Sequence, residues 1–418
     1  MRFLLRVIAY ASACVCVAVS TTSAQTLQFT PAPLIAPPSD VDPSDEARFR
    51  FGALRFTPWI AVSNVGTDNN VFNESENPKR DTTAAVGPAS SLWLRMGRSR
   101  LSGRVSGQYL YFKQYENQRA WNTANDLRWE IPLARITPFV VGTLSNTKDR
   151  PGYEIDSRVR RQDRSVGGGT LVRLSGKTTV AAAARRTKLE YDGTVIFNGA
   201  VLAQQLDRTV DTQELQLRMR LTPLTTFVVR GEAQQDRFAF ETRRNADSVT
   251  VMPGFQLRPQ ALIGGSAFVG VRRFNGSSGA LPDFTGVVAS VDTAYNVRAT
   301  QFQVRVTRDL MYSYEPRQPY FALTDAGLAV VQRITTSWDT VARASRQTMA
   351  YRNLAGLEDL EKRVDRSWIL GGGVGYHLGQ VMRLGVDLNY YRRESQTLDF
   401  RNFEGFRVGA SITYGLPQ

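Results

Sequence analysis

Apolar and polar side chains alternate along most extended segments of this chain after its first fifty residues. In the segment 299–314, for example, Phe302 and Val304 share one parity, whereas Gln303 and Arg305 share the other. Successive side chains of a β-strand point to opposite faces of its sheet. Each such segment therefore predicts a strand with one apolar face and one polar face.

Eighteen segments are predicted as strands, and most run about 11 to 16 residues, which is long enough to cross a bilayer at a tilt. They lie near residues 56–64, 84–96, 100–115, 122–132, 137–147, 162–174, 178–189, 207–221, 225–238, 247–258, 260–274, 284–296, 299–314, 321–334, 337–352, 366–378, 381–394 and 404–416. The segments 178–189 and 337–352 alternate poorly, and Arg308 interrupts the apolar row of its strand.

Short and long connections alternate between these segments. The short ones include Gly97-Arg98-Ser99 and Leu378-Gly379-Gln380, and the long polar ones include 65–83 and 148–161. Outer-membrane barrels of bacteria have an even number of strands, short periplasmic turns and long outer loops. The predicted fold is therefore an all-β, transmembrane antiparallel β-barrel of outer-membrane type with about 18 strands, in a range of roughly 16–18, and with a periplasmic N-terminus.

A soluble β-sandwich is the competing interpretation of the same alternation. The number and length of the strands exceed one sandwich, and aromatic residues gather near strand ends, as in the interfacial girdles of membrane barrels. They include Tyr109, Tyr111, Tyr115, Tyr312, Tyr314, Tyr390 and Tyr391 before long loops, and Trp129, Phe227 and Trp338 near short turns. The membrane barrel is therefore favoured, with its apolar rows toward lipid.

The N-terminal region divides into two parts. Residues 1–24 read as an export signal, because Arg2 precedes a short apolar core and small residues precede Gln25. Residues 25–50 are rich in proline and acids and are predicted as a flexible periplasmic segment. The transmembrane barrel then occupies residues 51–418.

The net charge of +14 raises the question of an acidic partner. Arginines are scattered singly over the strands instead of forming one basic patch, which favours a water-filled, anion-favouring lumen over nucleic-acid binding. Two interpretations stay open: a salt-bridged polar wall that tolerates water, or a selectivity track for anions. The candidate pore-lining residues are Arg104, Arg128, Arg218, Arg220, Arg230, Glu232, Arg305, Arg383, Asp387 and Arg407.

The sequence offers little evidence of a catalytic site. His377 is the only histidine, and it is expected as a polar side chain beside a short turn. Both cysteines, Cys14 and Cys16, lie within the predicted signal, so the mature chain offers no disulfide or thiolate metal site. We expect no enzymatic activity, no cofactor and no metal.

A local motif adds a resemblance. After the first strand, which contains Pro58-Trp59-Ile60-Ala61-Val62, comes Asp68-Asn69-Asn70-Val71-Phe72. This resembles the putative β-barrel porin 2 family of outer-membrane proteins over about residues 50–418. The resemblance implies an outer-membrane channel, and some members of the family are associated with exopolysaccharide production and export. The C-terminus departs from the usual barrel ending, because Tyr414 is followed by Gly415-Leu416-Pro417-Gln418.

The main hypothesis is a porin-like aqueous channel in the outer membrane of a Gram-negative cell, for polar solutes among which anions are one candidate class. One alternative is an export conduit for exopolysaccharide, which would work with periplasmic export proteins. The other is a non-conducting surface barrel that binds partners through its long loops. Outer-membrane lipid and the barrel-assembly machinery are expected partners, nucleic acid is not, and the oligomeric state, including a homo-oligomer, stays open.

Overall fold

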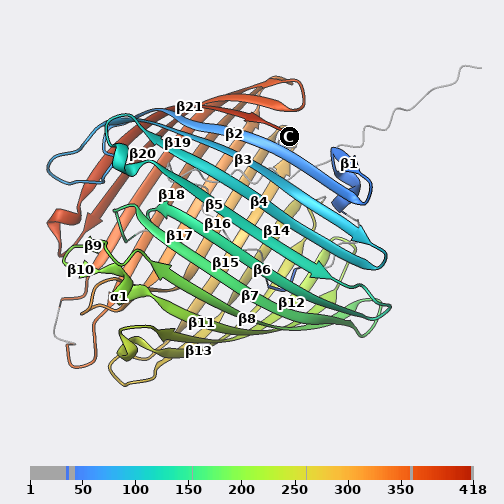
Figure 1. The fold of residues 1–418 in the computed structure, drawn as a ribbon, viewed down its shortest axis with the longest axis horizontal. Coiled ribbons are helices and arrows are strands. Elements are labelled where there is room, and N and C mark those ends of the chain that lie inside the picture. The colour runs from blue at the N-terminus through green and yellow to red at the C-terminus, as the bar shows by residue number, and fades with distance from the viewer. Residues whose placement is uncertain (1–33, 37–42, 153, 260, 358–360, 416–418) are drawn as a thin grey trace, which may run out of the picture.

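The computed structural model describes residues 34–36, 43–152, 154–259, 261–357 and 361–415 (Figure 1). The predicted signal, 1–24, lies outside the described residues. One antiparallel sheet of 19 strands dominates the fold, and all of its strands except the short β1 form a closed ring. The ring confirms the predicted fold class and the predicted strand number.

The ring consists of the following strands in chain order: β2 (Leu54–Asp68), β3 (Asp81–Met96), β4 (Ser99–Phe112), β5 (Ala120–Glu130), β6 (Ile136–Asp149), β7 (Val159–Arg173), β8 (Thr178–Tyr191), β11 (Arg208–Arg220), β12 (Thr225–Phe238), β13 (Ala246–Leu257), β14 (Ile263–Gly276), β15 (Phe284–Val297), β16 (Thr300–Tyr312), β17 (Tyr320–Arg333), β18 (Trp338–Arg352), β19 (Val364–Leu378), β20 (Met382–Ser395) and β21 (Phe403–Tyr414). Each strand pairs with its neighbours in sequence, as expected where short hairpins connect antiparallel strands.

Smaller elements lie outside the ring. They are β1 (Phe49–Phe51), β9 (Ile196–Phe197), β10 (Ala200–Val201), α1 (Leu202–Leu206) and the 3₁₀ turns η1 (Pro43–Glu46), η2 (Glu116–Gln118), η3 (Thr242–Arg244) and η4 (Asp399–Arg401). None of the helices in the described ranges is long and apolar enough to cross a membrane.

The ring closes where the first wall strand, β2, pairs with the last, β21. The register runs from Ile60 opposite Tyr414 to Asp68 opposite Arg407. A bulge interrupts it at Asn64, whose φ of 54° lies in the left-handed region that asparagine tolerates better than most residues. At Gly66 a Cβ would collide with the backbone of β21, so glycine permits the close approach of the two strands.

The two ends of the barrel differ. The short-turn end carries the connections 97–98, 131–135, 174–177, 221–224, 258–262, 298–299, 334–337 and 379–381. The long-loop end carries the connections 69–80, 113–119, 150–158, 192–207, 239–245, 277–283, 313–319, 353–363 and 396–402. In Figure 1, β1 marks the short-turn end, whereas the hairpin β9–β10 and α1 mark the long-loop end. The predicted alternation of short and long connections is confirmed.

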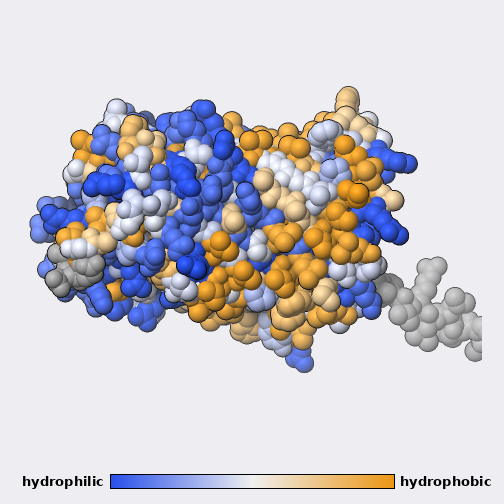
Figure 2. All heavy atoms as spheres, turned by 90° about the horizontal axis from the view of Figure 1, so that it is seen from below, coloured by the Kyte–Doolittle hydropathy of each residue, from blue (hydrophilic) through white to orange (hydrophobic). Residues whose placement is uncertain are grey.

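Apolar side chains cover the outer wall. In β16, Phe302 and Val304 are 39% exposed, and in β20, Val386 is 58% exposed. Figure 2 shows apolar side chains gathered over the half of this face nearer the short-turn end, with polar side chains over the half nearer the long loops. This outer surface suits a lipid environment at the apolar band, where burying apolar area is favourable.

The predicted aromatic girdle is only partly correct. Near the short-turn end Trp129 and Trp338 are exposed on the outer wall, as expected. At the other end, Tyr314 is only 1% exposed and packs within a cluster of loop residues, and the hydroxyl of Tyr391 donates to Asp68 at 2.6 Å. These two tyrosines turn inward because polar partners in the loops satisfy their hydroxyls, which a parity count cannot detect.

We expect a charge on the outer wall to cost more than the same charge on the inner face of the same strand. Val304→Arg should destabilise the folded barrel by about 2–4 kcal/mol if it lies near the bilayer midplane. Its neighbour Gln303, which donates to Gln301 at 2.6 Å on the opposite face, provides the matched control Gln303→Arg. Urea unfolding in phospholipid vesicles measures the free energy of unfolding of both variants. Equal losses of that free energy would contradict the assignment of the two faces.

Candidate functional site

The ten residues predicted to line a pore all have the parity opposite to the exposed apolar row of their strand. Arg305 lies beside exposed Val304, and Asp387 lies between exposed Val386 and Leu388. Pairing across the sheet preserves this parity, because Cα partners on adjacent strands point to the same face. The inner set is Arg104, Arg128, Arg218, Arg220, Arg230, Glu232, Arg305, Arg383, Asp387 and Arg407. Their role in a pore stays a prediction.

Near the short-turn end, one carboxylate gathers two basic groups. Asp339 on β18 accepts from the Arg383 guanidinium at 2.6 and 2.8 Å and also contacts the ring of His377. His377 therefore lies on the inner wall beside the turn 379–381. Asp339, Arg383 and His377 thus form one polar cluster of the inner wall.

Ion pairs also hold Arg305 and Asp387. Arg305 contacts Asp292 at 3.0 Å, and Asp387 contacts Arg343 at 3.3 Å. Gly371 makes room for Arg343, since a Cβ there would lie 2.5 Å from the Arg343 Nε. Glycine at position 371 therefore serves the packing of the inner wall.

On β11 and β12, inward side chains form a dense polar network. Arg230 contacts Glu214 at 3.3 Å, and Arg218 donates to Gln216 at 3.1 Å. Glu232 faces Glu214 directly across the pair of strands. Arg218 is 5% exposed, so most of its surface is covered by this network.

Two other predicted arginines lie in different settings. Arg104 lies with its guanidinium 5.8 Å from the ring centroid of Trp59, directly across from Asp126 on β5. Arg220 lies at the rim of the short-turn end and donates to the carbonyl of Gly176 at 2.7 Å. Arg220 is therefore an edge residue of the barrel, whereas Arg104 lies within the wall.

The N-terminal segment reaches the inner wall. Leu34 and Ile35 are 5% and 2% exposed and pack against Phe139, Val141, Leu171 and Ala181 of β6–β8, near the short-turn end. Arg128 donates to the Leu34 carbonyl at 3.2 Å and stacks over the Phe139 ring at 4.0 Å. These two residues belong to the segment predicted to be flexible, yet they pack against apolar side chains of the inner wall.

At the opposite end, the connection between β6 and β7 crosses the barrel. We call residues 150–152 and 154–158 the crossing loop. Its Glu154 accepts from the Ser313 hydroxyl at 2.6 Å and from the Tyr314 N–H at 3.1 Å. Eight wall strands, β7, β8 and β11–β16, separate the two partner loops around the ring. The contact therefore spans nearly opposite sides of the barrel.

Further contacts fix the crossing loop to the wall and to other loops. Asp156 accepts from Arg393 at 2.6 Å and from the amide of Asn73 at 2.9 Å, and Arg401 donates to the backbone of Glu154. Burial raises the pKa of the Glu154 carboxyl above its ordinary value, although Ser313 and Arg401 oppose this shift. The carboxyl is held by partners, as a buried acid requires.

An apolar cluster adjoins these polar contacts through Ile155. Ile155 and Val159 pack with Phe197 and with Leu202 and Leu206 of α1 against Tyr314. The rings of Phe197 and Tyr314 meet edge to face at 4.8 Å. The crossing loop and the connection 192–207 thus share a small hydrophobic core inside the long-loop end.

The Asp-Asn-Asn-Val-Phe motif lies at the edge of this assembly. Asp68 is fully buried and accepts from Tyr391, from Arg407 and from the Asn70 N–H, the last at 2.9 Å. The Val71 carbonyl accepts from Arg150 at 2.5 Å and from Arg158 at 3.1 Å. The motif therefore ties the closing seam of the barrel to the crossing loop.

Sequence reasoning missed the charged residues that make the contacts of the crossing loop and of the neighbouring loops at the long-loop end. They are Arg150, Glu154, Asp156, Arg158, Arg244, Arg363, Arg393 and Arg401. Most of them have partners far along the chain, such as Arg393 with Asp156 and Arg244 with the Ser313 carbonyl, so no spacing rule reveals these contacts. The one available signal was Ile155, an apolar residue surrounded by charges in a polar loop.

No group of three or more His, Cys, Asp or Glu side chains in the described ranges is placed to hold a metal ion.

Comparison with solved structures finds other bacterial outer-membrane proteins. OpdK from Pseudomonas aeruginosa is 8% identical, with 87% of this chain and 99% of that chain covered and a TM-score of 0.48. A BenF-like porin from Pseudomonas fluorescens Pf-5 is 10% identical, with 86% and 99% covered and a TM-score of 0.48. OccK5 (OpdH) from Pseudomonas aeruginosa is 10% identical, with 86% and 98% covered and a TM-score of 0.46. These similarities carry no information about the solute of the present barrel.

A search of curated proteins finds no match. The family described as "Putative beta-barrel porin 2" matches residues 42–415, which confirms the resemblance seen in the sequence. The match includes every wall strand from β2 to β21. The chain therefore belongs to the putative beta-barrel porin 2 family and is an outer-membrane β-barrel.

Proposed function

We propose that this barrel is a porin-like channel for polar solutes that favours anions and is narrowed at its long-loop end by the crossing loop. The observation that carries the proposal is the charged inner wall of a closed barrel whose outer wall is apolar. A barrel of about 18 strands is wide enough to enclose water unless loops fill it. Charged side chains on the inner face need that water.

The positive bias of the wall supports anion preference. Most of the predicted inner arginines have an acidic or carbonyl partner, so individual residues fit the salt-bridged wall. Without Arg2 and Arg6 of the predicted signal, the net charge of +14 becomes +12 for residues 25–418, and excess positive charge along a pore lowers the barrier for anions. Selectivity would then arise from the summed field and not from one ring of arginines.

The same proposal gives the orientation. We infer that the short-turn end and the N-terminus face the periplasm, since short turns lie on that side in bacterial barrels. Outer-membrane lipid and the barrel-assembly machinery are the partners that this placement requires. No catalytic role is included in the proposal, in which His377 and Arg383 contact Asp339 as part of the inner wall.

The two alternatives are less supported. An exopolysaccharide conduit with periplasmic export partners needs a wide path, whereas the crossing loop spans the lumen. A non-conducting barrel would agree with that loop, but it leaves the charged inner wall without a role. Unit conductance separates these cases.

Removing inner arginines should weaken anion preference. A unit charge about 10 Å from a permeating ion in water contributes about 0.4 kcal/mol, or roughly a factor of two in permeability. We expect Arg305→Ala and Arg383→Ala each to lower the chloride-to-potassium permeability ratio by roughly that factor. Arg308→Ala is the matched control, because exposed Arg308 on the opposite face donates to Thr324 at 2.7 Å. Reversal potentials in planar bilayers measure all three, and an unchanged ratio in both inner variants would remove those residues from the conduction path.

Loosening the crossing loop should widen the channel. Glu154→Ala leaves the buried Ser313 hydroxyl and Tyr314 N–H without their acceptor, a loss of about 1–3 kcal/mol. The population with a displaced loop should then rise by roughly 5- to 150-fold, since about 1.4 kcal/mol is a factor of ten. We expect a larger mean unit conductance than in the wild type. Glu116→Ala, which alters an exposed loop acid, should leave the conductance unchanged.

Displacing the N-terminal segment should raise the unit conductance through a change at the short-turn end. Ile35→Asp places a charge against Phe139 and Leu171, which disfavours the packed seat. If that seat narrows the lumen, unit conductance rises while the folded stability of the barrel stays close to that of the wild type. A fall in conductance, or no change, would show that Leu34 and Ile35 do not narrow the path.

A further inference from the structure

Two arginines of the crossing loop are held close together. The Nη2 of Arg150 donates to the Val71 carbonyl at 2.5 Å, and the Nη1 of Arg158 donates to the same oxygen at 3.1 Å. A shared carbonyl brings two positive charges together but supplies only a partial negative charge in return. The carbonyl therefore does not neutralise the two guanidinium charges.

Arg150 also has an unused donor. The residue is 6% exposed, and its Nε donates to the Asp156 carbonyl at 2.6 Å. Its buried Nη1, in contrast, has no hydrogen-bond partner. Buried polar groups without partners are rare in folded proteins, and each calls for an explanation such as an ion.

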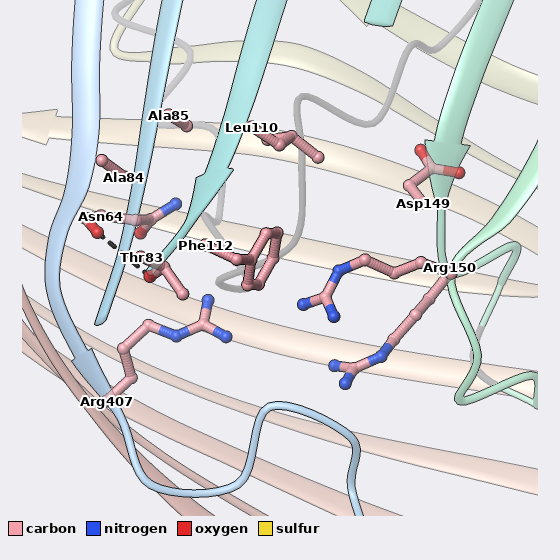
Figure 3. Close-up of a pocket in the computed structure, with 10 residues that line it drawn as sticks. Asn64, Thr83, Ala84, Ala85, Leu110, Phe112, Asp149, Arg150 and Arg407 are labelled. Carbon is pink, nitrogen blue, oxygen red and sulfur yellow. Dashed lines mark hydrogen bonds between the residues drawn. The ribbon is translucent and has the colours of Figure 1, made fainter. Parts of the chain in front are cut away.

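A small cavity adjoins this group. Its volume is about 30 Å³, room for about two water-sized groups. It is lined by Asn64, Thr83, Ala84, Ala85, Leu110, Phe112, Asp149, Arg150, Arg158 and Arg407. Figure 3 shows the side chains of Arg150 and Arg407 reaching toward it from opposite sides, with Phe112 between them.

The surroundings strengthen any charge interaction in the cavity. Val71, Ala85, Leu110 and Phe112 form an apolar cluster beside it, and Arg158 lies 4.5 Å from the centroid of the Phe112 ring. Low polarity raises the strength of ionic contacts. The pKa of the Arg158 guanidinium lies well below its ordinary value, first because its surroundings desolvate it and then because Arg150 and Arg407 repel a further positive charge.

The acids nearby do not balance the three guanidiniums. Asp68 pairs with Arg407, and Asp156 accepts from Arg393 at 2.6 Å. Asp149 accepts from the Thr147 hydroxyl at 3.3 Å and is the only acid among the lining residues. With Arg150, Arg158, Arg407, Asp68 and Asp149 counted together, one positive charge remains in excess.

We propose that the cavity between Arg150, Arg158 and Arg407 binds a compact anionic group, such as the carboxylate of a solute that enters at the long-loop end. An oxygen of that group would accept from the unpaired Nη1 of Arg150 and lie beside the Arg158 guanidinium. The volume admits the anionic group and not a whole solute, so the rest of the molecule would extend toward the lumen. The claim that a permeating solute binds here rests on the proposed channel function. The claim that the cavity binds an anion does not.

Bromide is a suitable probe, because its anomalous scattering locates it in crystals of the full chain. We expect a bromide peak beside Arg150 and Arg158 that acetate displaces and acetamide does not. Arg158→Gln should raise the bromide concentration for half-occupancy about tenfold, as expected for one lost charge-assisted contact. The control Arg160→Gln, an exposed residue that donates to Asn146 at 3.0 Å, should leave the peak unchanged.

Failure of the site and failure of the channel have different signatures. No bromide peak in the wild-type cavity, or equal occupancy in Arg158→Gln and wild type, overturns the anion site without reference to any variant's conductance. Displacement of bromide by acetamide as well as acetate would overturn the carboxylate assignment. A peak in a protein that gives no conductance steps would support the anion site and overturn only the channel.

Discussion

Closure of the sheet between β2 and β21 is the constraint on which the rest of the structure depends. In hydrocarbon no water is available for the backbone groups of an open edge, so a spanning sheet must pair its first strand with its last. The chain meets this requirement with a register from Ile60 opposite Tyr414 to Asp68 opposite Arg407. Only a closed wall separates lipid outside from charged side chains inside.

The seam also organises the long-loop end. Asp68 ends β2 at the seam, where it holds Arg407 of β21 and Tyr391 of β20. Three residues later, the Val71 carbonyl receives two arginines of the crossing loop. The short motif that suggests the family therefore links barrel closure to the crossing loop. Its asparagines contribute through hydrogen bonds, such as that from the Asn70 amide to the Glu74 carbonyl at 2.8 Å.

Strands, faces and the order of turns could be predicted from the sequence, because a period of two along a strand is a local property. Arg305 and Val304 reveal their opposite faces without knowledge of any neighbour. The partners of inner arginines could not be predicted, since Arg383 meets Asp339 through the register of three strands. Tyr314 shows where a parity count fails. Its sequence position matched the predicted aromatic girdle, but it lies two residues past the end of β16, among the loops, and its side chain is buried.

The long-loop end escaped prediction for a related physical reason. Loops have no period, and their contacts join distant residues, as Glu154 and Ser313 do across the barrel. Leu34 and Ile35 lie in a proline-rich segment whose composition suggests flexibility. A single apolar surface on β6–β8 is nevertheless enough to bury both side chains. Composition describes the average of a segment, whereas packing depends on a few residues.

Cross-linking across the seam tests the central claim most directly. Ala61 and Thr413 are register partners on β2 and β21. The native cysteines, Cys14 and Cys16, both lie in the predicted signal and would be absent from the mature protein. In membrane-inserted Ala61→Cys/Thr413→Cys protein, oxidation should form an intramolecular disulfide that alters gel mobility and reverses on reduction. Absence of that disulfide, together with cross-linking between molecules, would show an open edge and contradict the closed barrel.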